Sequence, residues 1–301
     1  MDYLCTKFCP MKKVYKVAGH RFSIEMPDSN PAWEMMHGNY DPFLVDDDGE
    51  VLFAVRYVDI MPDTTTKRLV TKDCPGEGFS EIGLYELEGR WLIEMTVPYS
   101  TEPTLFLLCE KDFSEALFHY TDDAHFSVET VLMVVYAFAT ACHDTLQMHA
   151  SVTMHQGKGY VFLGKSGTGK STHSRLWINN IEGCELLNDD NPVIRVHADG
   201  SVHVYGSPWS GKTPCYRNID VPIGAIVDLH QAKTNVIRRL SLPEAYAVIY
   251  VSFSGFRFIK EMADGLHATN AKIVSRVPVF SLDCLPDADA AFVCHKAVTQ
   301  Q

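Results

Sequence analysis

Residues 164–171 combine the residue types and the spacing that phosphate binding requires. They read Gly-Lys-Ser-Gly-Thr-Gly-Lys-Ser and match the pattern G-x-x-x-x-G-K-[ST]. In such a loop, glycines let backbone N–H groups approach phosphate oxygens closely. Lys170 would reach the β- and γ-phosphates, and the Ser171 hydroxyl would bind Mg²⁺. We therefore expect nucleotide phosphates to be held by a phosphate loop made of Gly164, Lys165, Ser166, Gly167, Thr168, Gly169, Lys170, Ser171 and Thr172.

The segments on either side of the phosphate loop support this interpretation. The run 160–163 before it is apolar and strand-like, and residues 172–180 after it can form a helix. The start of a helix adds unpaired N–H groups and a partial positive charge, and both favour a bound phosphate. Because a chance match rarely has both flanks, a plain glycine-rich turn is the weaker alternative.

A pair of aspartates ends a second apolar run, 186–188, and Asp189 lies 25 residues beyond Gly164. Acidic residues at a strand end beside a phosphate loop suit two tasks in phosphoryl transfer. We expect Asp190 to complete the Mg²⁺ shell and Asp189 to accept the proton of an attacking hydroxyl. The alternative is a simple Asp-rich turn over residues 189–192, which the sequence leaves open.

His149 lies 15 residues before Gly164. If 149–154 and 159–163 form a hairpin through 155–158, this histidine lies on the strand next to the phosphate loop. A lone histidine is more often structural than functional, so position alone leaves its role open.

Residues 206–213 also match the phosphate-loop pattern letter for letter. Their context is poorer, because Pro208 removes an N–H group and Pro214 follows with no amphipathic helix behind it. We expect a turn that faces the first loop, from which Lys212 and Arg217 would stabilise charge on the transferring phosphoryl group. A solvated basic pair on a surface loop is the alternative.

The stretch 149–190, with histidine, phosphate loop and Asp-Asp pair in order, resembles the core of the HPr kinase/phosphorylase family and the same core in phosphoenolpyruvate carboxykinase. A looser similarity to the endings of HPr-kinase-like proteins follows at 277–280 and 286–291. The resemblance implies an active-site role for His149 near the metal or the transferred phosphate. The HPr kinase partner domain and its glycine-rich signature are not evident, which puts HPr in doubt as the substrate. The carboxykinase's set of basic substrate-binding residues cannot be placed, which argues against lyase chemistry.

Together these features predict an ATP-dependent phosphotransferase, a kinase of the HPr-kinase-like type with ATP and Mg²⁺ as cofactors. The acceptor would be a serine-type hydroxyl on a protein, a peptide or a small molecule. The predicted catalytic residues are Asp189, Lys170, His149 and Arg217, and the predicted metal ligands are Ser171 and Asp190. The alternative is a non-catalytic module that senses nucleotide or binds a partner, but such a module can dispense with both aspartates.

The rest of the chain predicts an α/β protein in two parts. Residues 1–125 read as a β-rich domain of unknown role, with a hairpin over 82–97, and 126–147 read as a buried connecting helix capped by Ser127. Residues 148–301 read as an HPr-kinase-like phosphate-loop domain with a mixed central sheet. Its expected strands are 149–154, 159–163, 184–188, 193–197, 202–205, 222–229 and 277–283, and its expected helices are 170–180, 241–253, 257–268 and 287–299.

Composition narrows the class of protein. The 301 residues carry a net charge of −12 without a run of basic residues, which argues against nucleic acid or an anionic membrane as a partner. No signal peptide or membrane span is visible, because the longest apolar run, 131–141, is far short of about 20 residues. The chain has nine cysteines. Cys5 and Cys9 have the spacing of half a zinc site, but no second pair follows to complete it. We therefore expect the cysteines to be reduced thiols in the cytoplasm. The oligomeric state stays open, a homo-oligomer included.

Overall fold

The computed structural model describes residues 10–61, 63–73, 80–121, 124–211 and 213–300. The chain divides into two compact units, Met1–Ala139 and Thr140–Gln301. Cys5, Cys9 and Lys212, which figure in the sequence analysis, lie outside the described residues.

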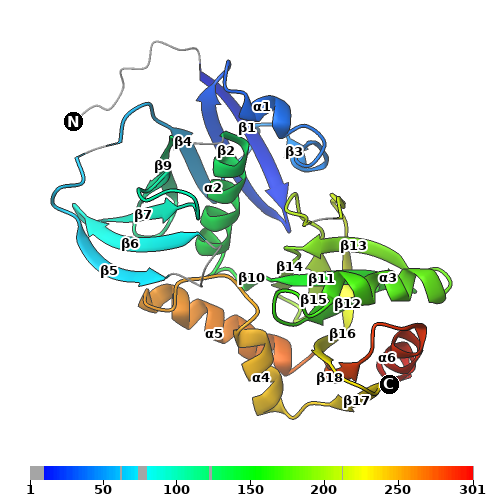
Figure 1. Ribbon diagram of the computed structural model, residues 1–301. Helices are drawn as coiled ribbons and strands as arrows, with labels where there is room; N and C mark the ends of the chain where they lie inside the picture. Colours follow the sequence, from blue (N-terminus) through cyan, green and yellow to red (C-terminus); the bar gives the residue numbers. More distant parts are fainter. Residues whose placement is uncertain (1–9, 62, 74–79, 122–123, 212, 301) are drawn as a thin grey trace. The chain divides into compact units, whose positions relative to one another are not determined.

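The first unit is built on a nine-stranded mixed sheet with the order β3-β1-β2-β4-β9-β8-β7-β6-β5 (Figure 1). Most neighbours are antiparallel, but β4 runs parallel to both β2 and β9. The β-rich character expected for this part is therefore confirmed. The strands are β1 (Pro10–Val17), β2 (His20–Pro27), β3 (Leu44–Val45), β4 (Phe53–Tyr57), β5 (Arg68–Asp73), β6 (Glu81–Leu87), β7 (Arg90–Thr96), β8 (Leu105–Cys109) and β9 (Glu115–Tyr120), with the short helices α1 (Ala32–Met35) and η1 (Asp41–Phe43).

The predicted hairpin is present as β6 and β7. Its turn is Glu88-Gly89, and both residues have positive φ, 49° and 78°. Two successive positive φ values are what a tight two-residue hairpin turn needs, and glycine adopts them without steric cost.

The predicted helix over 126–147 is shifted and shortened. Helix α2 runs over Ala124–Ala139, so Ser127 lies inside it and is not its cap. The chain then turns at residues 140–144 and forms a strand, β10 (Thr145–Gln147), that pairs with β14 in the second unit. The expected burial is confirmed, since the Tyr136 side chain is fully buried and its hydroxyl donates to the Val17 carbonyl at 3.1 Å. Strand pairing thus overrides helix propensity beyond Ala139.

The second unit carries another mixed sheet, with the order β10-β14-β15-β16-β12-β11-β13 and with β18 and β17 branching from β16 (Figure 1). The branch arises because the long β16 pairs with β15 through its first residues and with β12 and β18 through its later ones. The remaining strands are β11 (Ala150–His155), β12 (Lys158–Leu163), β13 (Glu185–Asp190), β14 (Val193–Val196), β15 (Val202–Tyr205), β16 (Asp220–Gln231), β17 (Val236–Arg239) and β18 (Val279–Cys284).

Four helices complete this unit: α3 (Lys170–Asn180), α4 (Leu242–Tyr250), α5 (Lys260–Val274) and α6 (Ala288–Thr299). Each predicted strand and helix of this half overlaps an observed one, although α5 begins and ends later than predicted and β17 was not expected. The core between α3, α6 and the sheet contains Phe162, Trp177, Val227 and Leu282. This core anchors both ends of the phosphate loop, because the preceding strand β12 and the following helix α3 both contribute to it.

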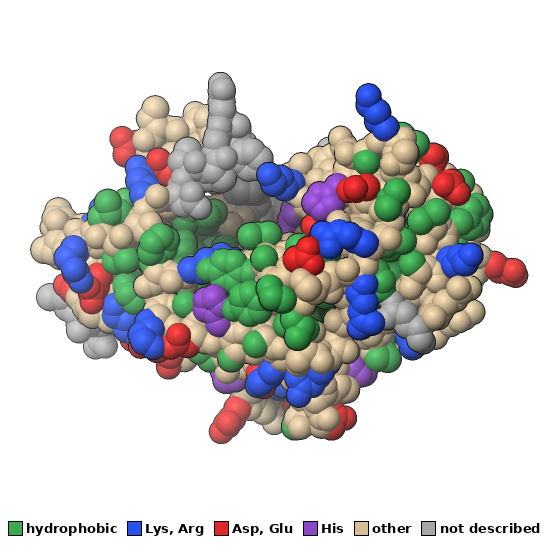
Figure 2. Space-filling view, turned by 90° about the horizontal axis from the view of Figure 1, so that it is seen from below, with side chains coloured by type: hydrophobic (Ala, Val, Ile, Leu, Met, Phe, Trp, Pro, Cys, Tyr) green, Lys and Arg blue, Asp and Glu red, His purple; other side chains and the backbone are tan. Residues whose placement is uncertain are grey.

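Within the described part of the chain, no helix combines the length and the apolar character needed to cross a membrane. On the face shown in Figure 2, the described basic and acidic side chains are interspersed and form no broad patch of one sign.

Candidate active site

The predicted order of strand, glycine-rich loop and helix is present at residues 158–180. Gly164, Gly167 and Gly169 have φ of 144°, 79° and 111°. Gly164 is also confined, since a Cβ there would lie 3.2 Å from the Leu229 carbonyl oxygen. These three positions therefore favour glycine, which adopts positive φ without steric cost. The loop leads directly into the start of α3, whose first N–H groups have no partner within the helix.

Lys170 folds back over the phosphate loop from the first turn of α3. Its ammonium donates a hydrogen bond of 2.9 Å to the Gly164 carbonyl, and the side chain is nearly buried. Burial lowers the Lys170 pKa, and the charges of Asp190 and Asp189 oppose that shift. The negative charges of both carboxylates therefore favour the charged form of this lysine.

The two aspartates are the last residues of β13, and not part of a loop turn. They pair across to β11, where Asp189 is opposite Ser151 and Asp190 is opposite Ala150. Because β11 also pairs with β12, a single strand separates the acidic pair from the strand that enters the phosphate loop. Asp189 is buried and Asp190 is partly exposed, so the two carboxylates experience different environments.

Asp190 has a backbone conformation that side-chain-bearing residues rarely adopt, with φ of 135°. Its neighbours hold it there, since it forms an isolated bridge with Ser210, and the Gly211 N–H donates to the Asp189 carbonyl. Strain of this kind costs roughly 1–3 kcal/mol and is concentrated at functional sites.

We expect Asp190→Gly to raise the free energy of unfolding by about 1 kcal/mol, because glycine adopts this φ without strain. Part of the stabilisation is lost again, because glycine gives the unfolded chain more conformational freedom. Urea unfolding of this variant and of Asp190→Asn measures the effect. Asp190→Asn keeps the side chain at the same φ and should not stabilise the protein. Equal stability of the two variants would contradict the interpretation that the backbone at Asp190 is strained.

His149 lies directly before β11, and its backbone N–H donates to the Ser252 carbonyl at 2.7 Å. Its Nδ1 atom lies 3.4 Å from Asp190 Oδ1, so the structure brings this predicted residue to the acidic pair. Burial lowers the His149 pKa, the charge of Lys170 lowers it further, and Asp190 opposes both effects. The imidazole is therefore mainly neutral at pH 7.

Arg217 is the predicted site residue that the structure does not bring to the others. Its guanidinium donates to Glu185 Oε2 at 2.8 Å and to the Leu186 carbonyl at 2.9 Å. These partners belong to the beginning of β13, whereas Asp189 and Asp190 end it. At about 3.3 Å per strand residue, the two ends lie more than 10 Å apart.

The aromatic side chains near the phosphate loop are buried. Trp177 and Trp209 are fully buried and cannot stack on a nucleobase. His173 is also buried, and its Nε2 atom accepts a hydrogen bond from Trp177 Nε1 at 3.1 Å. Arg175, two residues further along the helix, is exposed. The helix that follows the phosphate loop thus uses these aromatic side chains for packing.

Burial lowers the His173 pKa to about 4 from an ordinary value near 6.5. Between these two values the unfolded chain binds the proton and the folded chain does not, so stability falls as pH falls from 6.5 to 4. The loss is about 3 kcal/mol, at about 1.4 kcal/mol per pH unit. His173→Gln can still accept from Trp177 but does not titrate, and its unfolding free energy should lack this part of the pH dependence. Parallel pH curves for the two proteins would contradict the prediction.

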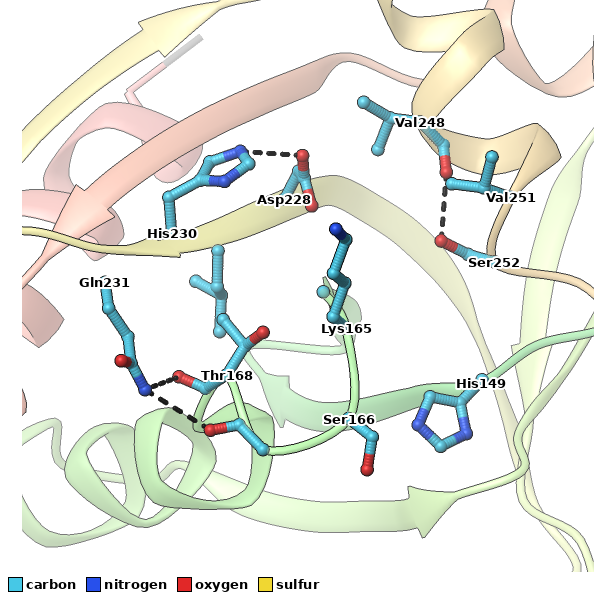
Figure 3. Close-up of a pocket in the computed structure, with 13 residues that line it drawn as sticks. His149, Lys165, Ser166, Thr168, Asp228, His230, Gln231, Val248, Val251 and Ser252 are labelled. Atoms are coloured by element: carbon cyan, nitrogen blue, oxygen red, sulfur yellow. Dashed lines mark hydrogen bonds and ion pairs between the residues drawn. The ribbon is translucent and has the colours of Figure 1, made fainter. Parts of the chain in front are cut away.

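A cavity of about 930 Å³ opens over the first half of the phosphate loop (Figure 3). Opposite the loop it is lined by residues that the sequence analysis did not identify, namely Asp228, His230, Gln231, Val248, Val251 and Ser252. Gln231 supports the loop directly, because its amide donates to the Gly167 and Thr168 carbonyls at 3.3 Å each. The sequence feature that could have identified this wall is Asp228, near the end of the predicted strand 222–229. Its position beside the phosphate loop, however, depends on the parallel pairing of β16 with β12.

A second cavity, of about 400 Å³, lies beside the other half of the phosphate loop. Its walls are mainly apolar, and its polar lining side chains are Thr168, Thr172, His173 and Gln231. The apolar lining residues are Leu176, Leu229, Ala232, Leu285 and Pro286.

Comparisons with known proteins give a distant likeness. No family model matches the chain, and no curated protein matches its sequence. Among solved structures, the HPr(Ser) kinase/phosphatase from Coxiella burnetii is similar over 50% of this chain and 93% of its own, with 13% identity and a TM-score of 0.29. This is a weak structural neighbour with a kinase-like fold, and a TM-score this low carries no argument about the site.

Proposed function

We propose that the protein is an ATP-dependent phosphotransferase that moves the γ-phosphoryl group to a hydroxyl group. One observation carries the proposal. The Lys170 ammonium is held on the phosphate loop by Gly164, and β13 ends in Asp189 and Asp190 with a single strand, β11, between it and the strand that enters the loop. A cation, a phosphate cradle and two carboxylates in one place are the parts that phosphoryl transfer uses.

The position of Lys170 also orients the triphosphate. The lysine of such a loop reaches the β- and γ-phosphates, and its ammonium here lies at Gly164, the first residue of the loop. The γ-phosphate would therefore lie toward the 930 Å³ cavity, and the nucleoside would extend the opposite way past Thr172. The mainly apolar 400 Å³ cavity on that side suits a nucleobase.

The residues present fit Mg²⁺. This ion is usually held by one or two carboxylates together with substrate phosphates, so it needs no larger cluster. Among the described residues no group of three or more His, Cys, Asp or Glu could hold a metal by itself. The partly exposed Asp190 and the Ser171 hydroxyl supply the hard oxygen ligands that Mg²⁺ prefers. When bound, the ion would neutralise charge on the phosphates.

The chemical step assigns a role to each remaining residue. The acceptor oxygen attacks the γ-phosphorus, the bond from that phosphorus to the β-phosphate oxygen breaks, and ADP leaves. Asp189 takes the hydroxyl proton, and Lys170 stabilises the charge that develops on the leaving phosphate. His149, neutral and 3.4 Å from Asp190, would orient that carboxylate. Arg217 is left out of the catalytic set because it is bound at the far end of β13.

The cysteine chemistry is consistent with a reducing compartment. Six described cysteines are free thiols, namely Cys109, Cys142, Cys184, Cys215, Cys284 and Cys294. These free thiols support the proposal that the protein works in the cytoplasm, where thiols stay reduced.

Incubation of the protein with γ-labelled ATP, Mg²⁺, free serine and a cell extract tests the function. We expect the label to move to serine or to a component of the extract, and we expect the Lys170→Ala protein to transfer none. Tight ATP binding without any transfer would instead favour a nucleotide-sensing module. Absence of ATP binding would contradict the proposal altogether.

A further inference from the structure

The 930 Å³ cavity has one wall that phosphate binding does not explain. The loop side provides residues 164–168, and His149 lies at one end. The opposite wall is formed by the end of β16 and by Val248, Val251 and Ser252 at the end of α4 (Figure 3). If the γ-phosphate lies toward this cavity, the group that attacks it must lie here as well.

Asp228 is the acidic group of that opposite wall. Strand pairing holds it firmly, since it is opposite Leu163 of β12 on one side and Ser281 of β18 on the other. Its side chain is only 15% exposed, and burial raises its pKa. A carboxylate that is partly removed from water gains most from a nearby cation.

His230 holds one oxygen of this carboxylate and leaves the other available. The distance from His230 Nε2 to Asp228 Oδ2 is 2.8 Å, and among the described residues His230 is the one recorded partner of the Asp228 side chain. Figure 3 shows the second oxygen directed into the cavity, on the side of Lys165. The second oxygen of Asp228 is thus available to a ligand in the cavity.

Other charges in the cavity belong to the phosphate side. Lys165 is exposed and is part of the phosphate loop, so its ammonium is available to a bound phosphate. His149 is engaged with Asp190. The bound acceptor therefore faces one carboxylate, two valine side chains and a serine, which suits a short apolar stem that carries a positive charge.

We propose that this cavity is the acceptor site and that Asp228, held by His230, binds an ammonium group on the hydroxyl compound that is phosphorylated. The inference rests on the proposed phosphotransferase. The acceptor class is a small amino alcohol. Its hydroxyl oxygen forms the new bond to the γ-phosphorus, the hydroxyl proton passes to Asp189, ADP leaves, and the ammonium stays on Asp228 throughout.

Alcohols of matched size that differ in charge test the proposal. The full chain is given ATP and Mg²⁺ with ethanolamine, ethylene glycol or glycolate, and separately with serinamide or its N-acetyl derivative. We expect kcat/KM to be at least about 10-fold higher for ethanolamine and serinamide than for their uncharged or anionic counterparts, since a charged hydrogen bond is worth about 1.5–3 kcal/mol.

Asp228→Asn removes the charge and keeps the shape. We expect KM for the two amines to rise at least about 10-fold, with KM for ATP unchanged within about twofold and the preference for charged alcohols lost. Asp199→Asn, an exposed aspartate in the turn between β14 and β15, serves as the matched control and should behave as the unaltered protein.

Three outcomes would overturn the inference: equal use of ethanolamine and ethylene glycol, an unchanged amine preference in Asp228→Asn, or no transfer to any of the five alcohols by a protein that does transfer the label to a component of the cell extract. In each of these outcomes the protein still transfers the γ-phosphoryl group. They are therefore distinguishable from failure of the proposed function, in which neither the alcohols nor any component of the extract accepts the label.

Discussion

Replacing Lys170 with alanine is expected to weaken ATP binding about 10²-fold or more and to reduce phosphoryl transfer below detection. The ammonium is nearly buried and points into the phosphate loop, where its hydrogen bond to Gly164 marks the path of the β- and γ-phosphates. Two charged hydrogen bonds at about 1.5–3 kcal/mol each account for that loss. Isothermal titration with a non-hydrolysable ATP analogue measures the affinity, and γ-labelled ATP measures transfer.

The same substitution should leave the protein folded. Burial lowers the Lys170 pKa, which means that the folded state bears a desolvation cost for this charge. Removing the charge therefore should not reduce the thermal midpoint. Lys158→Ala is the matched control, because Lys158 is an exposed lysine at the start of β12, at the end of that strand remote from the phosphate loop. Similar losses of ATP affinity in both variants would show that the effect is general and not specific to the phosphate loop.

Asp189→Asn is expected to reduce phosphoryl transfer by about 10² or more while ATP affinity stays close to that of the unaltered protein. Asparagine has nearly the same size, so the buried end of β13 should keep its pairing with Ser151. What it lacks is the ability to accept the hydroxyl proton. Single-turnover transfer from γ-labelled ATP to the acceptor identified with the extract measures the chemical step apart from binding.

Asp199→Asn provides the control for this substitution, since Asp199 is fully exposed in the turn between β14 and β15. It should change neither binding nor transfer. Unchanged transfer in Asp189→Asn would remove this residue from the role of base. A loss of ATP affinity equal to the loss of transfer would instead indicate that Asp189 helps to hold the metal.

Local sequence patterns were sufficient for the elements around the phosphate loop. The strand that enters it, the glycines inside it and the helix after it lie within about 20 consecutive residues. The β11–β12 hairpin also needs only neighbouring residues, with Gln156 and Gly157 at positive φ in its turn. Such features depend on side-chain periodicity and on turn residues, and both can be identified from neighbouring positions in the sequence.

Strand pairing in the sheet determined which residues that are far apart in the sequence became neighbours. Asp228 lies beside the phosphate loop because β16 pairs with β12 in parallel, which joins positions 163 and 228. Arg217 meets Glu185 at the beginning of β13, and not the acidic pair at its end, because the segment before β16 approaches the beginning of β13. The end of α2 at Ala139 likewise follows from the pairing of β10 with β14.

The order of strand, glycine-rich loop and helix at residues 158–180 was therefore readable from the chain alone, because the motif is short and its residues are identified by type. Strand order, the strained φ of Asp190 and the burial of His173 were not readable, because they arise from contacts between segments that only the folded sheet brings into register. Local preference is weak compared with the free energy of packing those segments together, so tertiary contacts determine which residues share a site.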